Sequence, residues 1–365
     1  VLVMTCPWAL GWASAVPVTM GMTHAASQGV LLQDAEALES IRGLDVMLFE
    51  RSGTLTEGQP VVAQMDLVGE VTLPEALSML LAVERRSRHV VAQAFEQYGR
   101  QHLKPTEVLD VPEAQTFRQI PGQGVIAQVH GQEVLVGMRS LLAQKGVNTP
   151  DTDDLSGGQL YLAVDGKLWA RALVCDPFRP DSVETVECMN EDGIRTLLIT
   201  ASPPEEALAA AKTVGIAPEN VRAGMDTAAH GQVARAMRAA GFQVGVVGNV
   251  DSDQGSLQAA DVSFGLVTAG TLGQKPCGVS LLRPGAGGVM AAFSIARQAF
   301  RVIRQNIVVS ILVMLAGIPA ALGQLPLHGA VLGMFLAVLL VGLNGLRVLP
   351  DPTVRVKLDS KGSAD

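Results

Sequence analysis

The chain has 365 residues, of which 48% are hydrophobic and only 17% charged, whereas roughly 25% charged residues is usual for a soluble domain. This length has room for about two or three domains, and the mean hydropathy of +0.31 is high for a soluble protein. The net charge of −8 and the lack of a basic patch with interleaved aromatic residues argue against nucleic acid as a partner. The four cysteines are scattered without a Cys-x-x-Cys pair, which indicates neither a zinc knuckle nor a disulfide framework.

The chain opens with a stretch, residues 1–33, that contains no Asp, Glu, Lys or Arg. Its first part, residues 1–27, is long enough to cross a bilayer as a helix, although Pro7 and Pro17 interrupt it. Proline inside a membrane helix frees backbone carbonyls, and such helices build ion sites in this way. Because no charged region precedes the apolar stretch, it does not look like a signal peptide. We expect the chain to be truncated at its start or to come from an incomplete reading frame.

Residues 28–45 have a helix-like pattern that would connect this segment to a sheet, and an apolar run then ends at Glu50. A run this apolar is typical of a strand buried on both faces, as in a parallel sheet. In such sheets the chemistry lies just beyond the carboxyl ends of the strands. Glu50 is therefore placed where a catalytic carboxylate would lie, and a Gly/Thr-rich turn follows it.

The turn carries a resemblance to a known family. Residues 50–56 resemble the phosphorylation motif of P-type ATPases, Asp-Lys-Thr-Gly-Thr-Leu-Thr, and Gly58 also matches. Glu50 stands at the position of the phosphorylated Asp, Arg51 at that of the Lys and Ser52 at that of the first Thr, whereas residues 53–56 match, among them Thr54. The alternative is an ordinary strand and turn, and the rest of the chain decides between the two.

With that family in view, Cys6-Pro7-Trp8 resembles the Cys-Pro-Cys of heavy-metal-transporting P-type ATPases. A soft thiolate beside unwound backbone suits copper or zinc, so the resemblance makes Cys6 a candidate metal ligand. The second thiol of the motif is replaced by Trp8. The alternative is that Cys6 is a small packing hydrophobe, which is the commoner role of a lone buried cysteine.

Residues 61–174 have the pattern of a separate inserted domain, with a helix at 76–84 and alternating strands up to Gly137. His89 follows that helix in a stretch that resembles the family's adenine-contacting Ser-Glu-His-Pro-Leu, although Arg88 and Val90 replace the Glu and the Pro. Gly122 and Gly124 resemble its Gly-x-Gly, where the lack of a side chain lets backbone approach the nucleotide. A structural histidine and a hairpin turn are the alternatives. We interpret the insert as an ATP-binding domain, intact or vestigial.

Residues 176–182 return the chain to the sheet and resemble the family's hinge after the nucleotide domain. Beyond them helices and strands alternate, which is typical of a doubly wound α/β domain. The expected elements are helices at 183–191, 205–214 and 227–240 and strands at 196–199 and 243–247. Together with the strand before Glu50, residues 28–60 and 175–290 resemble the haloacid-dehalogenase-like phosphorylation domain of these pumps.

The strand ends of this domain have lost charged groups of the family. Thr200-Ala201-Ser202 stands where the family has Thr-Gly-Asp, and His230 stands where it has a Lys at the phosphate. Asn249 replaces an Asp that is a magnesium ligand in the family, while Asp253 keeps the second carboxylate of that motif. Asp251 is a possible substitute. The resemblance therefore implies ATP and Mg²⁺ as cofactors and also suggests that binding of both has been weakened or lost.

Residues 305–346 again contain no Asp, Glu, Lys or Arg, a length that supports two helical crossings of about 20 residues each. We place two transmembrane helices within 298–349, with a break at 323–326 and a tail at 350–365. Arginines flank the paired helices on both outer sides, and the loop between them has none. The positive-inside rule then places both ends and the α/β body in the cytoplasm, in a multi-pass membrane protein of the bacterial inner-membrane type. A buried helix hairpin of a soluble protein is the alternative.

The resemblance covers nearly the whole chain, with its landmarks in the family's order. It implies a P-type ATPase-like membrane protein related to heavy-metal cation pumps, without the family's actuator domain and earlier membrane helices. We expect it to be catalytically impaired at Glu50 and to act only in nucleotide binding or regulation, as a partner of a pump or of a missing upstream segment. One alternative is an active copper- or zinc-type cation pump seen as a fragment. Another is a soluble phosphatase of the same α/β superfamily.

Overall fold

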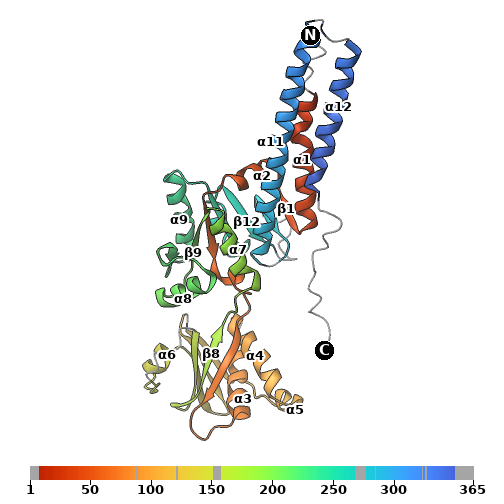
Figure 1. The fold of residues 1–365 in the computed structure, drawn as a ribbon. Helices are drawn as coiled ribbons and strands as arrows, with labels where there is room; N and C mark the ends of the chain where they lie inside the picture. Colours follow the sequence, from red (N-terminus) through yellow and green to blue (C-terminus); the bar gives the residue numbers. More distant parts are fainter. Residues whose placement is uncertain are drawn as a thin grey trace. The chain divides into compact units, whose positions relative to one another are not determined.

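The computed structural model describes residues 8–87, 89–120, 122–150, 158–267, 277–283, 285–322, 324 and 327–349. The chain divides into two compact units (Figure 1). The first unit contains residues 1–50, 183–199 and 225–365, and the second contains residues 51–182 and 200–224. Each unit therefore collects segments that are far apart in the sequence.

The first unit is built on a mostly parallel sheet, in which the strands lie in the order β1, β13, β12, β11, β2, β9. Their bounds are, in that order, Val30–Leu32, Val279–Leu281, Val262–Leu266, Val244–Asn249, Val46–Glu50 and Arg195–Ile199. All these neighbours pair in parallel except β1 and β13, which are antiparallel. Every residue of β2 is buried, which confirms the prediction of a strand covered on both faces.

The helices of this part of the chain follow the predicted alternation, with small changes at their ends. The observed bounds are α2 Ala35–Arg42, α7 Pro180–Glu191, α9 Thr227–Ala239 and α10 Gln254–Leu257. The helix-like interpretation of residues 28–45 is wrong at its start, because β1 occupies Val30–Leu32 before α2 begins. The cause is the pairing of β1 with β13, a contact between residues about 250 positions apart that local periodicity does not report.

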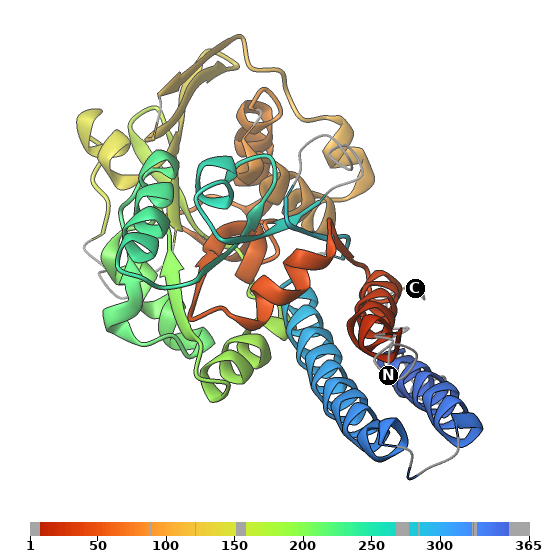
Figure 2. The same cartoon turned by 90° about the horizontal axis from the view of Figure 1, so that it is seen from above.

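Three long helices of the first unit lie side by side, α1 (Trp8–Ser27), α11 (Gly287–Ala321) and α12 (Leu327–Gly345) (Figures 1 and 2). A buried amide joins them, because Asn306 Nδ2 lies 3.2 Å from the carbonyl oxygen of Ala13 and 3.3 Å from that of Val341. Among the described residues, two stretches are long and apolar enough to cross a membrane, Gly287–Leu315 and Val331–Val348. Helix α1 is not one of these, so its membrane crossing stays a prediction.

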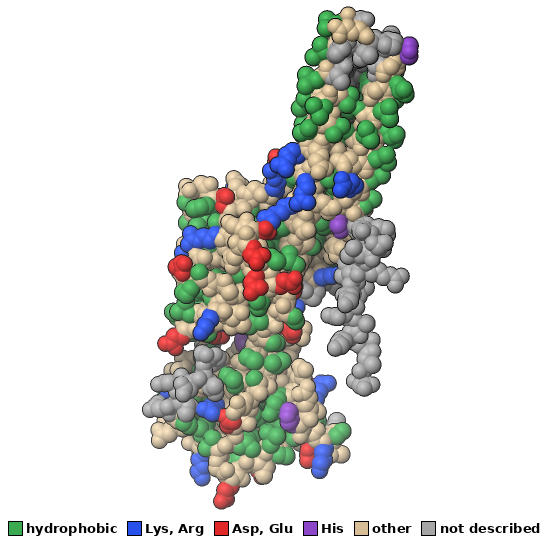
Figure 3. Space-filling view, in the orientation of Figure 1, with side chains coloured by type: hydrophobic (Ala, Val, Ile, Leu, Met, Phe, Trp, Pro, Cys, Tyr) green, Lys and Arg blue, Asp and Glu red, His purple; other side chains and the backbone are tan. Residues whose placement is uncertain are grey.

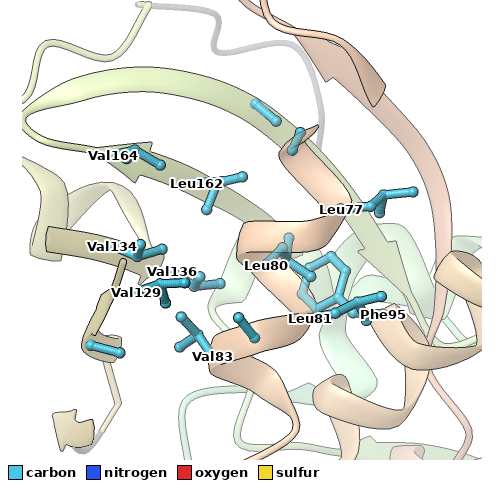
Figure 4. Close-up of a cluster of buried hydrophobic side chains, with 14 of the residues drawn as sticks. Leu77, Leu80, Leu81, Val83, Phe95, Val129, Val134, Val136, Leu162 and Val164 are labelled. Carbon is cyan, nitrogen blue, oxygen red and sulfur yellow. The ribbon is translucent and has the colours of Figure 1, made fainter. Parts of the chain in front are cut away.

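The second unit contains an antiparallel sheet in the order β3, β8, β7, β6, β5, β4. The strands are, in that order, Val61–Leu67, Lys167–Cys175, Gly158–Val164, Gln132–Gly137, Gly124–Val129 and Thr116–Ile120, and the helices are α3 Leu73–Glu84, α4 Val90–His102, α5 Pro105–Leu109 and α6 Arg139–Gln144. Leucines of α3 and Phe95 of α4 pack against valines and leucines of the sheet (Figure 4). This unit also contains the turn Arg51–Leu55, α8 (Pro204–Val214), the short helix Pro218–Asn220 and β10 (Val221–Arg222).

The predicted class, a doubly wound α/β domain with an inserted α+β domain and long apolar helices, is confirmed. Strand β3 begins at Val61 and β8 ends at Cys175, close to the limits of 61 and 174 expected for the insert. The finer domain boundaries stay predictions.

Candidate active site

The candidate site lies at the carboxyl end of the parallel sheet. Glu50 is the last residue of β2 and Asn249 the last residue of β11, and these strands are hydrogen-bonded neighbours in parallel. Because parallel strands end at the same edge, both side chains start from one edge of the sheet. Gly248 keeps this edge compact, since a Cβ there would lie 2.9 Å from Asp253 Oδ2 and 3.2 Å from Glu50 Cγ.

His230 contacts the carboxyl group of Glu50 from helix α9, which begins after the N-cap residue Asp226. The Nδ1 atom of His230 lies 2.8 Å from Glu50 Oε1, and its Nε2 lies 3.1 Å from the carbonyl oxygen of Met225. A carbonyl oxygen only accepts, so Nε2 carries a proton and donates it to Met225. The contact between Nδ1 and Glu50 then needs one more proton, held by either the imidazole or the carboxyl group. The pair therefore shares a single proton inside the protein.

The surroundings favour retention of that proton. Burial raises the pKa of Glu50, and the nearby charge of Asp253 adds to this, although the hydrogen bond from His230 opposes it. Burial alone would lower the pKa of His230, but the hydrogen bond and charge of Glu50 outweigh it and raise the pKa. The pKa values of both groups are therefore raised, and the proton shared by Glu50 and His230 is lost at a higher pH than the proton of a free imidazole.

Ser256 lies beside the pair and is fully buried, and sequence reasoning missed it. Its Oγ lies 2.8 Å from the carbonyl oxygen of Asp253 and 3.2 Å from Glu50 Oε1. It does not form a nucleophile–base pair with His230, because both ring nitrogens of His230 already face Met225 and Glu50. Helix α10, which begins after Asp253, places Ser256 beside the pair. A single serine three residues after an aspartate has no recognisable signature in a sequence, which is why it was missed.

The magnesium-site positions are engaged in local hydrogen bonds. Asp253 Oδ2 accepts from the backbone N–H of Asn249 at 2.7 Å, and Asn249 Oδ1 accepts from the backbone N–H of Asp251 at 2.9 Å. Asp251, the suggested substitute ligand, is exposed, and burial raises the pKa of Asp253. Mg²⁺ requires near-octahedral oxygen donors, usually with anionic carboxylates. In the described part of the chain no three His, Cys, Asp or Glu side chains gather as a metal site. Because Mg²⁺ is usually held by one or two carboxylates with water and substrate phosphates, the loss of Mg²⁺ binding stays a prediction.

The other predicted catalytic residues belong to the second unit. The guanidinium of Arg51 lies 2.7 Å from Glu206 of α8, an ion pair that sequence reasoning missed. Ser52 is exposed, whereas Thr54 is fully buried and its hydroxyl has no hydrogen-bond partner among the residues described. Thr200 is buried, and its hydroxyl accepts from the backbone N–H of Ser202 at 3.2 Å.

The turn that contains Thr54 is joined to the hinge after the insert. Thr56 Oγ1 lies 2.5 Å from Asp176 Oδ2, and the backbone N–H of Gly58 donates to Asp176 Oδ1 at 2.9 Å. Both ends of the insert are thereby held together by one carboxylate. The hinge stretch was recognised in the sequence, but the role of Asp176 was not.

The candidate nucleotide-binding residues lie in the second unit. His89 is exposed and caps helix α4, where its Nδ1 accepts from the backbone N–H of Val91 at 3.4 Å. Gly122 has a φ of +71°, and a Cβ there would meet nothing within 4 Å, so only the backbone conformation favours glycine at this position. Gly124 is different, since a Cβ there would lie 2.3 Å from the carbonyl oxygen of Val136. The packing of the sheet is therefore enough to require glycine at position 124. The predicted contacts of His89, Gly122 and Gly124 with a nucleotide stay predictions.

This difference gives a testable prediction. Gly124→Ala is expected to destabilise the second unit by about 3 kcal/mol, because the backbone φ of +144° is unfavourable for alanine and the methyl group collides with a neighbouring strand. Gly122→Ala is the matched control and should cost only about 1 kcal/mol from backbone strain. Hydrogen exchange of strand β5 in the full chain measures both. Equal costs for the two variants would contradict the packing role of Gly124.

The candidate metal ligand Cys6 lies outside the described residues. Trp8, which stands at the position of the family's second thiol, is the first residue of α1 and is 64% exposed.

The comparisons with known proteins agree with this architecture. A family profile for haloacid dehalogenase-like hydrolases matches residues 44–261, and the chain belongs to that family. Within it, the chain is related to the heavy-metal-transporting P-type ATPases, which confirms the resemblance found in the sequence.

Two relatives and one solved structure illustrate the relationship. The chain is 30% identical over 333 residues to the probable copper-transporting ATPase HMA5 of Arabidopsis thaliana, which covers 89% of this chain and 33% of the relative. It is 29% identical to a copper-exporting P-type ATPase of Legionella pneumophila, over 96% of this chain and 47% of the relative. It also resembles a crystal structure of a zinc-transporting PIB-type ATPase in an E2.Pi state, with a TM-score of 0.76 and 25% identity over 95% of this chain and 57% of that one. The chain thus spans between a third and about half of the length of the two curated relatives.

Proposed function

We propose that this chain is a P-type ATPase-like membrane protein, derived from heavy-metal cation pumps, whose acceptor position does not form a phosphoenzyme at a useful rate. The observation that carries the proposal is the contact between Glu50 and His230, 2.8 Å long and buried from solvent. The carboxyl group that would have to attack a phosphoryl group is held by an imidazole and shares its proton. Nucleotide binding or regulation of a partner pump is then the remaining role.

Three physical effects at this position act in the same direction. Phosphoryl transfer depends mostly on positioning and on the neutralisation of charge by Mg²⁺ and a cation. Glu50 carries one methylene more than Asp, and a misplacement of about 1 Å can cost on the order of 100-fold in rate. Asn249 supplies no charge for Mg²⁺, and its side-chain oxygen already accepts from the backbone N–H of Asp251. The charge of His230 is neutralised by Glu50 rather than offered to a phosphate.

The membrane location and cytoplasmic body are part of the same proposal. Two candidate spans support it, as does the hydrogen bond from Gln298 Nε2 to the carbonyl oxygen of Arg347 at 2.8 Å. This bond places Gln298, which precedes the charge-free stretch 305–346, at the level of Arg347, which follows it. Arginines at both positions, together with the positive-inside rule, favour the cytoplasmic side. ATP is proposed to bind the second unit, near His89 and Gly122.

The second candidate is an active ATP-driven copper- or zinc-type pump of which this chain is a part. The retained turn favours it, since the hydroxyl of Thr54 is buried without a partner among the described residues and would be satisfied by a phosphate oxygen. In that case the heavy-metal cation is the cargo. Metal-stimulated ATP hydrolysis by the full-length gene product separates this candidate from the first.

The decisive test is acid-stable labelling with γ-labelled ATP, in membranes that contain the full-length gene product. We expect no hydroxylamine-sensitive label above background, because the nucleophile is not free. The matched variant carries Glu50→Asp, His230→Lys and Asn249→Asp, which restores the family's residues at these three positions and should raise the label. Strong label on the native protein that disappears in Glu50→Gln would overturn the proposal and support the active pump.

A further inference from the structure

We propose that one face of α11 is a binding surface for anionic phospholipid headgroups of the leaflet next to the α/β body, formed by Arg301 and Arg304 with Arg42 of α2. This inference rests on the membrane location given above. It goes beyond the relationship to metal pumps, because it concerns the lipid and not the cargo or the nucleotide. Its evidence comes entirely from the first unit.

The spacing of the residues on α11 defines the surface. Arg297, Phe300, Arg301 and Arg304 lie at positions i, i+3, i+4 and i+7, which places them on one side of the helix. Arg304 is the last charged residue before the charge-free stretch 305–346, so this side chain stands at the edge of the uncharged part of α11. Figure 3 shows Lys and Arg side chains gathered where the apolar surface of the long helices starts.

The charges on this face are not all neutralised by the protein. Arg297 forms an ion pair with Asp192, at the end of the face furthest from the span. Arg301 and Arg304 are exposed, and neither has an acidic partner within the part of the chain that the structure describes. Two unpaired guanidinium groups on successive turns can bind phosphate oxygens through several donors each.

Arg42 adds a third cation that is held in place. Its guanidinium carbon lies 5.1 Å from the centre of the Phe300 ring, a cation–π geometry. Phe300 lies between Arg297 and Arg301 in the sequence and on the same face of α11. The ring therefore holds Arg42 against the face of α11 that also carries Arg301 and Arg304, without neutralising its charge.

Distances along the helix support a lipid occupant. Arg301 and Arg304 are separated by roughly 4.5 Å along the axis at 1.5 Å per residue, within the layer of headgroups that covers about 5–7 Å on each side of a bilayer. Clusters of basic residues immediately next to a membrane helix attract anionic lipids. Arg42 and Arg297 also line a recess of about 450 Å³ together with Asp45 and Asp192, whereas Arg301 and Arg304 do not, so the two unpaired arginines carry the lipid contact.

The test uses the full chain in detergent, with native mass spectrometry of bound phosphatidylglycerol and phosphatidylcholine. We expect preferential retention of phosphatidylglycerol, weakened about tenfold by Arg301→Gln with Arg304→Gln and by high salt. The matched control, Arg118→Gln with Lys167→Gln, removes the same charge from exposed positions of the second unit and should change nothing. The variant Arg301→Lys with Arg304→Lys should retain most of the preference, which separates charge from a folding defect.

Several outcomes would overturn this inference. These are equal retention of the two lipids, an equal loss in the control variant, and complete displacement of the lipid by inorganic phosphate, which would indicate a site for soluble anions. Failure of the membrane proposal itself is seen separately, because alkaline carbonate would then extract the chain from membranes. A chain that stays in the membrane but shows no lipid preference contradicts the inference alone.

Discussion

Replacing His230 by alanine is expected to lower the free energy of unfolding of the first unit by about 3 kcal/mol at pH 7, as when one member of a buried ion pair is removed. His230 is 4% exposed and Glu50 5%, so water does not replace the imidazole. The carboxyl group would keep only the hydroxyl of Ser256, and the carbonyl oxygen of Met225 would lose its donor. Hydrogen exchange of strands β2 and β11 in the full chain measures the loss.

Glu50→Gln is the matched variant and should cost less than about 1 kcal/mol. Its amide N–H donates to Nδ1 of a neutral imidazole, while Nε2 continues to donate to Met225, so both ring nitrogens of His230 keep their partners. Equal losses for His230→Ala and Glu50→Gln would contradict the shared-proton arrangement.

The same pair predicts a pH dependence with a definite sign. The raised pKa of His230 means that the folded pair keeps a proton that a free imidazole loses above about pH 6.5. The folded state then binds one proton more than the unfolded chain, so stability is complete below that pH and falls as the pH rises, by up to about 1.4 kcal/mol per unit. In Glu50→Gln this slope should disappear.

Glu84→Gln is expected to stabilise the second unit by about 3 kcal/mol at pH 8 and to have almost no effect at pH 4.5. Glu84 ends helix α3 and is 7% exposed, and burial raises its pKa to about 7 from an ordinary 4.5. Ionisation of the folded protein is therefore unfavourable, and stability is lost as the pH rises from about 4.5 to about 7. A difference of about 2.5 pKa units corresponds to roughly 3 kcal/mol.

Local hydrogen exchange of α3 and β5 between pH 5 and pH 8 measures this difference. Glu96→Gln is the control, because Glu96 is partly exposed in an ion pair with Arg100 and should change stability by less than about 0.5 kcal/mol. A stability difference between Glu84→Gln and the native chain that does not vary with pH would contradict the prediction.

Much of the architecture could be predicted because it depends on local pattern. The apolar run before Glu50 has no polar alternation, and this pattern predicts a strand buried on both faces. Strand β2 is indeed buried at every position. The uncharged stretch 305–346 could be recognised as two helices from its length alone. The departures from the family's motifs at residues 50–56, 230 and 249 could also be found in the sequence. They are changes of residue type, which need no structure to be recognised.

The sequence by itself therefore determined the class of fold and the relationship to heavy-metal pumps, while the loss of the family's charged residues stays a prediction. Only the tertiary structure decided which side chains meet at the candidate site. Glu50 and His230 are 180 residues apart, and whether they meet depends on the placement of α9 against the sheet edge. The hydrogen bonds that close the Asn249–Asp253 loop and the packing that excludes a side chain at Gly124 are likewise set by distant backbone. Local periodicity reports which face of an element is apolar, but hydrogen bonding and proton sharing are decided by groups that folding brings together.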